Sequence, residues 1–284
     1  MQTIIDRRGK YTNNIPQSNH NSPKSLFELV EKAHSSLAIE LFCISLHIKT
    51  DIEMSLNEKA NIGKLFDGIA KTYDKFNHVT SLGIDIWWRN EAIGGMTPVK
   101  SMLDVAIGTG DVAMTAIRKN KAQHVTGIDL SQEMMNIGIE KVAKAGMKGK
   151  VDFMLGSALD MPYDDCQFEA VTCAYGIRNF SELDRGLSEM YRVMKPGGQL
   201  VILEFSYPKN PVIRWGYNLY FSHIMPWLGK IISNDGSAYR YFLNSVKQFI
   251  WGEEMIAHLR DAGFVNAKFR TMTFGITTLY TATK

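Results

Sequence analysis

The stretch Leu103–Asp111 constrains the fold of this 284-residue chain more than any other. An apolar run that carries one acid, Asp104, breaks there into two glycines, Gly108 and Gly110, separated by a single residue. Glycine lets the backbone turn sharply and lets a ligand approach main-chain N–H groups that a Cβ would cover. Because residues 112–119 continue with helical spacing, the pattern predicts a strand, a tight turn and a helix that hold a nucleotide-like cofactor.

Strand-like and helix-like segments alternate after the glycine turn, which is typical of a parallel sheet with helices on both faces. Residues 267–274 and 275–283 then alternate around a glycine and predict a closing hairpin. The expected earlier strands are 101–107, 124–130, 151–155, 168–175 and 199–205. The prediction is an α/β fold of the Rossmann-like class: a doubly wound, mostly parallel seven-stranded sheet, helices on both faces, and an antiparallel last strand.

Two regions lie outside this alternation. Residues 1–55, rich in Asn and Ser as far as residue 25 and with a candidate helix at 25–47, are expected to be an N-terminal appendage to one domain at 56–284. Residues 207–250 lack a clear period and are rich in Trp, Tyr and Phe. We expect them to be an aromatic insertion before a last helix at 253–261.

Composition argues against several classes of protein. The net charge is +3 and the longest run of basic residues is Arg7-Arg8, which speaks against nucleic acid as a partner. Three cysteines without a Cys-x-x-Cys pair indicate a reducing compartment and no structural metal. The apolar stretch 37–48 is interrupted by Glu40 and His47 and is shorter than the roughly 20 residues that span a bilayer. We therefore expect no transmembrane segment and a cytoplasmic protein.

Asp104 favours a cationic cofactor. A carboxylate just before the glycine turn would repel a pyrophosphate, whereas S-adenosylmethionine carries an ammonium and a sulfonium and no phosphate. The structural alternative is a buried acid that accepts hydrogen bonds from the N–H groups of its own loop. The spacing Gly108-x-Gly110-x-x-Ala113 also fits the dinucleotide fingerprint, so a nicotinamide-dependent oxidoreductase stays open as an alternative.

Two further positions complete the expected cofactor site. Asp129, at the end of the second predicted strand, is placed to accept hydrogen bonds from ribose hydroxyls; the alternative is that it caps the next helix with Ser131. Ser157 and Ala158, after the third strand, are small enough to lie against an adenine; the alternative is an ordinary exit from the strand.

Two long motifs resemble a known family. They are Tyr73-Asp74-x-Phe76-Asn77-x-x-Thr80-Ser81-x-x-x-Asp85-x-x-Trp88 and Arg192-Val193-Met194-Lys195-Pro196-Gly197-Gly198-x-Leu200-x-x-Leu203-Glu204-x-Ser206. Shorter matches are Tyr175-Gly176-Ile177-Arg178-Asn179 and Ala238-Tyr239-x-Tyr241-Phe242-x-x-Ser245-Val246. With them, residues 60–284 resemble the ubiquinone and menaquinone biosynthesis C-methyltransferases, within the class I S-adenosylmethionine-dependent methyltransferases.

The chain departs from the family's pattern at four positions. Phe76 stands where the family often has Met, Asp85 where it often has His, and Ile107 where a small residue is usual. Ala174 replaces a Ser that touches the cofactor in some members, so that contact is not carried over. Residues 1–53 have no counterpart, and we expect them to be either disordered or absent from a native product that starts at Met54.

The resemblance implies an enzyme that moves a methyl group from S-adenosylmethionine to a ring carbon of a polyprenyl quinol drawn from the membrane. Demethylmenaquinol, giving menaquinol, is the first choice; a 2-polyprenyl-6-methoxy-1,4-benzoquinol of ubiquinone biosynthesis is the alternative. The family's cofactor contacts fall on Thr109, Asp129, Ser157 and Ala158. No metal is implied. The expected location is cytoplasmic, with peripheral contact at the inner face of the membrane as a further option.

Arg178 is the candidate catalytic residue. A phenol titrates near about 10, so the site must stabilise the quinolate or supply a base. Arg178 cannot itself deprotonate, but its fork of donors suits an oxyanion; the alternative is a structural clamp on a carboxylate. The general base is not identified; the candidates are Asp111, His78, His223 and a water molecule. The aromatic insertion is interpreted either as a slot for the isoprenoid tail or as ordinary core.

Overall fold

The computed structural model describes residues 62–225 and 237–284. Contacts divide the chain into residues 1–55 and 56–284. The predicted appendage at 1–55, its candidate helix and the alternative start at Met54 lie outside the described residues. The description below therefore concerns the second unit, which carries every predicted site residue.

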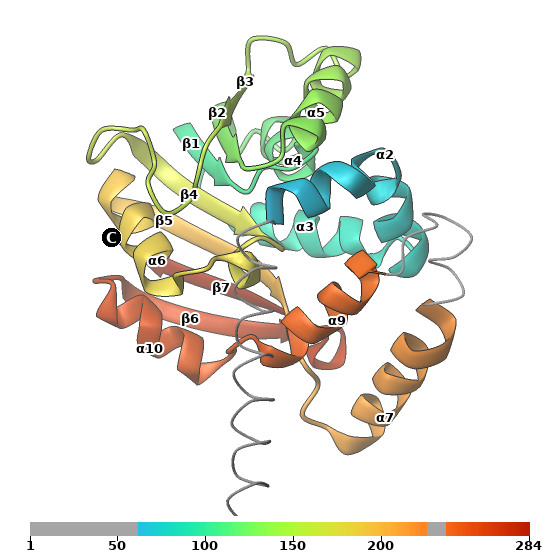
Figure 1. Cartoon of the computed structure of the whole chain (residues 1–284). Coiled ribbons are helices and arrows are strands. Elements are labelled where there is room, and N and C mark those ends of the chain that lie inside the picture. The colour runs from blue at the N-terminus through green and yellow to red at the C-terminus, as the bar shows by residue number, and fades with distance from the viewer. Residues whose placement is uncertain (1–61, 226–236) are drawn as a thin grey trace, which may run out of the picture. The chain divides into compact units, whose positions relative to one another are not determined.

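The sheet has seven strands in the order β3-β2-β1-β4-β5-β7-β6 (Figure 1). They are β1 (Val99–Val105), β2 (Ala122–Asp129), β3 (Val151–Leu155), β4 (Phe168–Ala174), β5 (Met194–Phe205), β6 (Val265–Met272) and β7 (Thr277–Thr283). The first five pair in parallel, and β7 runs antiparallel to both neighbours. This confirms the predicted sheet, including its antiparallel last strand.

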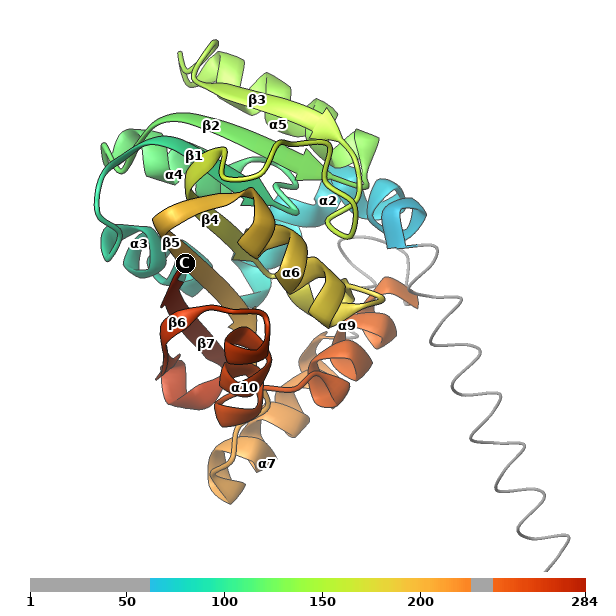
Figure 2. The same ribbon diagram turned by 90° about the vertical axis from the view of Figure 1, so that its left-hand side faces the viewer.

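Helices cover both faces of the sheet (Figures 1 and 2). Successive residues of a strand therefore pack against different layers of helices. Met102 of β1 packs with α3 (Ile84–Gly94), α4 (Asp111–Arg118) and α5 (Gln132–Lys144). Leu103, its neighbour in the same strand, packs on the opposite face with α6 (Leu183–Val193) and α10 (Glu253–Asp261). Both side chains are fully buried, because a central strand has no face left for solvent.

Among the described residues, α2 (Ile62–Thr80), α7 (Pro211–Leu219), η2 (Tyr220–Ile224) and α9 (Ser237–Gln248) lie outside these two layers. α2 lies at the end of the sheet toward which β2 and β3 point (Figure 2). Described parts of the aromatic insertion form α7, the π-helical turn η2 and α9. Residues 226–236 of the insertion lie outside the described residues. None of the helices in the described ranges has the length and hydropathy to cross a bilayer.

Most predicted strand ends differ from the structure by one or two residues, and the largest difference is at β5, which begins at Met194 rather than at Gln199. The register shifts between the pairs Phe168–Met194 and Ala170–Gln199, so the intervening Pro-Gly-Gly residues form a bulge within the strand. Gly197 has a φ of 75°, and its N–H donates to the Lys284 carbonyl at 2.8 Å. The Lys-Pro-Gly-Gly sequence correctly predicted the end of α6. The residues that follow form a bulged strand, in which their backbone groups make hydrogen bonds.

The strand order reverses at β1, with β2 on one side and β4 on the other. In open α/β sheets, ligands bind outside the carboxyl ends of the strands at this reversal. The glycine turn leaves β1 at that point, which places the site there.

Candidate active site

The glycine turn is held to the end of β2 by Asp129. Gly108 has a φ of 54°, a conformation that favours glycine. Its N–H donates to Asp129 Oδ2 at 2.7 Å, while Ser131 N donates to Asp129 Oδ1 at 2.9 Å. Burial, only partly offset by these hydrogen bonds, raises the pKa of Asp129 above its usual value. Both oxygens retain lone pairs for further donors.

A cavity of about 250 Å³ opens at this turn and brings together four of the predicted cofactor residues: Gly108, Asp129, Ser157 and Ala158. They come from the turn after β1, the end of β2 and the loop after β3. In that loop, Ser157 Oγ accepts a hydrogen bond from Leu159 N at 3.1 Å. A partly buried carboxylate with free lone pairs and a surface of small residues therefore line one cavity, and their roles toward ribose and adenine stay predictions. These residues fit S-adenosylmethionine.

The other three predicted cofactor residues do not line this cavity. Asp104 is buried within β1, accepts a hydrogen bond from Thr172 Oγ1 at 2.6 Å, and has its pKa raised to about 7 by burial. Gly110 caps α4 with a φ of 80°, and a Cβ there would lie 3.2 Å from the Phe153 ring. Both residues support the glycine turn from the protein interior and do not face the cavity. Contact between Asp104 and a cofactor stays a prediction.

Thr109 points toward α2 instead of into the cavity. Its hydroxyl donates to Asp74 Oδ1 at 2.7 Å and accepts from Lys141 Nζ at 3.1 Å. Lys141 also lies 2.6 Å from Asp74 Oδ2 and 2.6 Å from Asp111 Oδ1. The side chain of Thr109 therefore joins the glycine turn to the helix above it.

α2 covers the cavity and is attached at two points, neither of which the sequence analysis identified. Asp67 Oδ1 accepts hydrogen bonds from Ser131 Oγ at 2.6 Å and Glu133 N at 3.1 Å, at the N-terminus of α5. Asp74 makes the second attachment. Asp74 stood within a motif, but its partner Lys141 lies on another helix and only the tertiary structure brings the two together. Phe66 and Tyr73 of α2 line the cavity.

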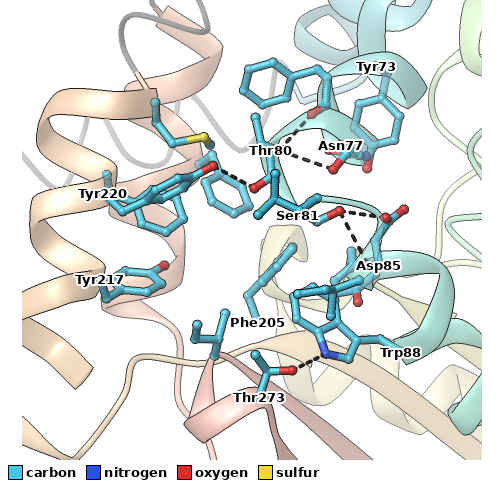
Figure 3. A pocket seen from close by; sticks show the side chains of 18 of the residues that line it. Tyr73, Asn77, Thr80, Ser81, Asp85, Trp88, Phe205, Tyr217, Tyr220 and Thr273 are labelled. Atoms are coloured by element: carbon cyan, nitrogen blue, oxygen red, sulfur yellow. Dashed lines mark hydrogen bonds between the residues drawn. The ribbon is translucent and has the colours of Figure 1, made fainter.

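A second, larger cavity of about 520 Å³ lies on the other side of α2. It shares Phe66, Tyr73 and Tyr175 with the first cavity. Its walls come from α2, α3, α7, η2 and α9 and are mostly apolar, as Figure 3 shows for Trp88, Phe205, Tyr217 and Tyr220. The aromatic insertion thus lines a cavity and also contributes a small buried cluster of Tyr217, Phe221 and Met225, and the tail slot stays a prediction.

Polar groups collect at one part of this second cavity. Asp85 of α3 accepts hydrogen bonds from Ser81 Oγ at 2.6 Å, His78 Nδ1 at 2.7 Å and Arg89 Nη2 at 2.8 Å. Although burial opposes it, the hydrogen bond from Ser81 and the charge of Arg89 hold the pKa of Asp85 below its usual value. Asp85 is therefore ionised, and His78 carries its proton on Nδ1.

Arg178 lies in the wall of the same cavity, in the 3₁₀ turn η1 (Ile177–Asn179). Its Nη1 donates to Glu204 Oε1 at 2.7 Å, and its guanidinium carbon lies 5.6 Å from the Phe205 ring centre and 5.2 Å from that of Phe242. Although burial lowers the pKa of Arg178, the charge of Glu204 raises it further, so the group stays cationic. Arg178 therefore holds a carboxylate through Nη1, as the structural alternative predicted. Its catalytic role stays a prediction.

The predicted candidates for the base are unequally placed. Asp111 is bound by Lys141 and lies 3.4 Å from Arg89 Nη2. His223 is exposed, with Nδ1 3.3 Å from the Leu219 carbonyl. His78 contacts Asp85, which itself lines the cavity. Within residues 62–225 and 237–284, no group of three or more His, Cys, Asp or Glu side chains is arranged to hold a metal ion.

Sequence comparison finds relatives along most of the chain. The model of the ubiE/COQ5 methyltransferase family matches residues 53–284. A demethylmenaquinone methyltransferase of Bacteroides fragilis is 45% identical over 225 residues, which cover 78% of this chain and 92% of the relative. One from Porphyromonas gingivalis is 40% identical, covering 82% and 96%. A ubiquinone/menaquinone biosynthesis C-methyltransferase of Geotalea daltonii is 41% identical, covering 81% and 99%.

Solved structures with similar folds are more distant. An S-adenosylmethionine-dependent methyltransferase of Thermotoga maritima superposes with a TM-score of 0.58 at 18% identity, covering 78% of this chain and 99% of the other. The [4+2]-cyclase SpnF gives a TM-score of 0.57 at 19% identity, covering 78% and 94%. These likenesses show the fold, that of class I methyltransferases.

Proposed function

Because the chain belongs to the ubiE/COQ5 methyltransferase family, we propose that it methylates a ring carbon of a polyprenyl quinol, converting demethylmenaquinol to menaquinol with S-adenosylmethionine. The similar enzymes named demethylmenaquinone methyltransferase support this substrate. A methoxybenzoquinol of ubiquinone biosynthesis is the second candidate, supported by the name of the Geotalea relative. Family membership rules out the nicotinamide-dependent alternative.

One observation carries the proposal. The cavity at the glycine turn and the apolar cavity share Phe66, Tyr73 and Tyr175 as a common wall. The two cavities therefore adjoin at these three residues. A methyl donor in the first cavity and a quinol ring in the second would face each other there, as an in-line transfer from sulfur to carbon requires.

In the first cavity, Asp129 would accept hydrogen bonds from the ribose hydroxyls, and Ser157 and Ala158 would lie against the adenine. S-adenosylmethionine supplies an electrophilic methyl group. Gly108 lets the backbone approach the ligand, and its bond to Asp129 keeps the carboxylate oriented. The co-substrate site needs no metal.

In the second cavity, Arg178 would stabilise the negative charge on a quinol oxygen. Because Glu204 neutralises part of the guanidinium charge at 2.7 Å, Arg178 can be buried without a ligand and still offer donors to an oxyanion. The quinolate donates electron density to its ring, and the ring carbon would form a bond to the methyl group as the methyl–sulfur bond breaks and its electron pair stays on sulfur. The ring carbon then loses its proton. The reaction yields S-adenosylhomocysteine and releases one proton overall.

The His78–Asp85 pair is the proton acceptor that the geometry favours. Asp85 lines the cavity as a carboxylate, and His78, 2.7 Å away, has a side chain that is 40% exposed. A proton that reaches Asp85 can therefore pass through His78 to water. Because the lowered pKa of Asp85 makes this carboxylate a weak base, the proton would have to be handed on to His78.

The remaining aromatic walls would hold the isoprenoid tail, which the enzyme must take from a membrane. The proposed location is therefore cytoplasmic, with contact at the inner face of the membrane. A direct test supplies the purified chain with S-adenosylmethionine and either demethylmenaquinol or the methoxybenzoquinol, and measures the methylated quinone by mass spectrometry. We expect demethylmenaquinol to be methylated faster. Methylation of neither quinol would refute the proposal.

A further inference from the structure

The mouth of the quinol cavity is bordered by apolar side chains that face solvent. Leu82, in the turn before α3, is 86% exposed, and Val212 and Trp215 of α7 are 73% and 69% exposed, although all three also line the cavity. Phe274 of the turn η3 (Thr273–Gly275) is 79% exposed. With Trp87 of α3, these four residues are called the apolar rim below.

Hydrogen bonds tie the three rim segments into one surface. Tyr220, which follows α7, donates to the Thr80 carbonyl at the end of α2 at 2.6 Å. Trp88 Nε1 of α3 donates to Thr273 Oγ1 of η3 at 2.8 Å. Figure 3 shows both bonds on opposite parts of the cavity wall. The segments that carry the rim residues are thus joined to one another around the cavity. Apolar patches of this kind mark interaction sites in soluble proteins.

The segment that supplies Val212 and Trp215 of the rim is poor in acids. Residues 205–252 contain five Lys or Arg and one acid, Asp235, so that this segment carries +4 while the whole chain carries +3. Within it, the side chains of Lys209, Arg214 and Lys247 are exposed. Each of them also lies over a Tyr or Trp ring. Apolar and aromatic tips beside exposed cations complement a lipid surface whose headgroups are anionic.

We infer that the apolar rim is a docking surface for a bilayer that contains anionic phospholipids. Trp87, Trp215, Leu82, Val212 and Phe274 would enter the headgroup region, where Trp is favoured, and the neighbouring Lys and Arg would contact lipid phosphates. The inference rests on the proposed function, since a polyprenyl quinol is dissolved in the bilayer. Docking by the rim brings the mouth of the cavity to the lipid, so that the quinol enters without crossing water.

Vesicle sedimentation of the full chain tests the inference. The variant Trp87→Gln/Phe274→Asn removes two rim side chains that do not line the cavity, and Asn suits the φ of 58° at position 274. Binding to phosphatidylglycerol–phosphatidylethanolamine vesicles should weaken at least tenfold. The matched control Ile139→Gln/Val265→Gln removes side chains that are 49% and 54% exposed elsewhere and should bind within twofold of the unsubstituted chain. Neutral phosphatidylcholine vesicles should bind more weakly than anionic ones.

Turnover separates this inference from the proposed function. The rim variant should methylate long-chain demethylmenaquinol in vesicles at least fivefold more slowly, and a short-chain, water-soluble quinol at an unchanged rate. Equal vesicle binding by the rim variant and the unsubstituted chain would overturn the inference. So would a rim variant that converts a dimer to a monomer without changing vesicle binding, since the rim would then contact a second copy. A chain that binds vesicles but methylates no quinol would instead contradict the proposed function.

Discussion

Asp74 of α2 accepts a 2.7 Å hydrogen bond from the hydroxyl of Thr109 in the glycine turn. This contact fastens the helix that covers the cofactor cavity to the backbone that forms its floor. Lys141 bridges the same two residues, with Nζ 2.6 Å from Asp74 and 3.1 Å from Thr109. Both cavities are bordered by α2, so its attachment couples the two binding sites.

Asp74→Asn should loosen α2. The ion pair with Lys141 is about one quarter exposed, so its loss should cost only about 1 kcal/mol of stability. Affinity for S-adenosylhomocysteine, measured by titration calorimetry, should fall by roughly fivefold. Glu140→Gln, which removes an exposed pair with Lys144, serves as the control and should change neither quantity.

Asp129→Asn tests the ribose contact. The amide retains one acceptor but loses the charge that strengthens hydrogen bonds from hydroxyls. The dissociation constant of S-adenosylhomocysteine should rise roughly 10- to 100-fold, as expected for about 1.5–3 kcal/mol. Asp152→Asn, at an exposed carboxylate of β3, should bind normally. Unchanged affinity in the Asp129 variant would remove the residue from the site.

Arg178→Lys tests oxyanion stabilisation. Removing the cation altogether would leave Glu204 buried and unpaired, which typically costs about 3–5 kcal/mol and would confound the result. Lys keeps a charge near Glu204 but lacks the planar fork. We expect kcat to fall by about 100-fold or more, with the affinity for S-adenosylhomocysteine unchanged. Near-normal turnover would assign Arg178 to structure alone.

Asp85→Asn tests the proton acceptor. The variant should lower kcat by roughly 100-fold, because the amide cannot accept the proton. His78→Gln, which keeps a donor near Asp85 but cannot pass on a proton, should lower kcat less. If Asp85→Asn retains near-normal turnover, the acceptor lies elsewhere.

Asp104→Asn tests the buried carboxyl. Burial raises its pKa from 3.8 to about 7, so between these values the folded state binds a proton that the unfolded state has lost. This group therefore stabilises the fold at low pH, and its contribution falls by up to about 1.4 kcal/mol per pH unit as pH rises toward 7. Denaturation at pH 4.5 to 8 should show this decline as a difference between the two proteins. A constant difference would contradict the raised pKa.

Much of the sheet could be predicted because its signals are local. Runs such as Val151–Leu155 are bounded by turn residues. Neighbouring apolar residues such as Met102 and Leu103 point to opposite faces of the sheet, and both faces are covered by helices. The early start of β5 could not be predicted, because it depends on Gly197 bonding to Lys284 at the other end of the domain. The arrangement of the insertion could not be predicted either, since its helices α7 and α9 pack around a cavity whose other walls come from distant parts of the chain.

For the site, the sequence by itself determined the position of the glycine turn after β1 and of Asp129 at the end of β2. Both depend on local sequence, because glycine permits the turn and the strand end follows from the neighbouring residues. Gly108, Asp129, Ser157 and Ala158 meet at one cavity as predicted. Only the tertiary structure decided where the other side chains point. Thr109 bonds to Asp74, 35 residues earlier in the chain, and Arg178 pairs with Glu204 of β5. Such contacts arise from the packing of separate elements, and packing decides which polar groups must be paired once water is excluded.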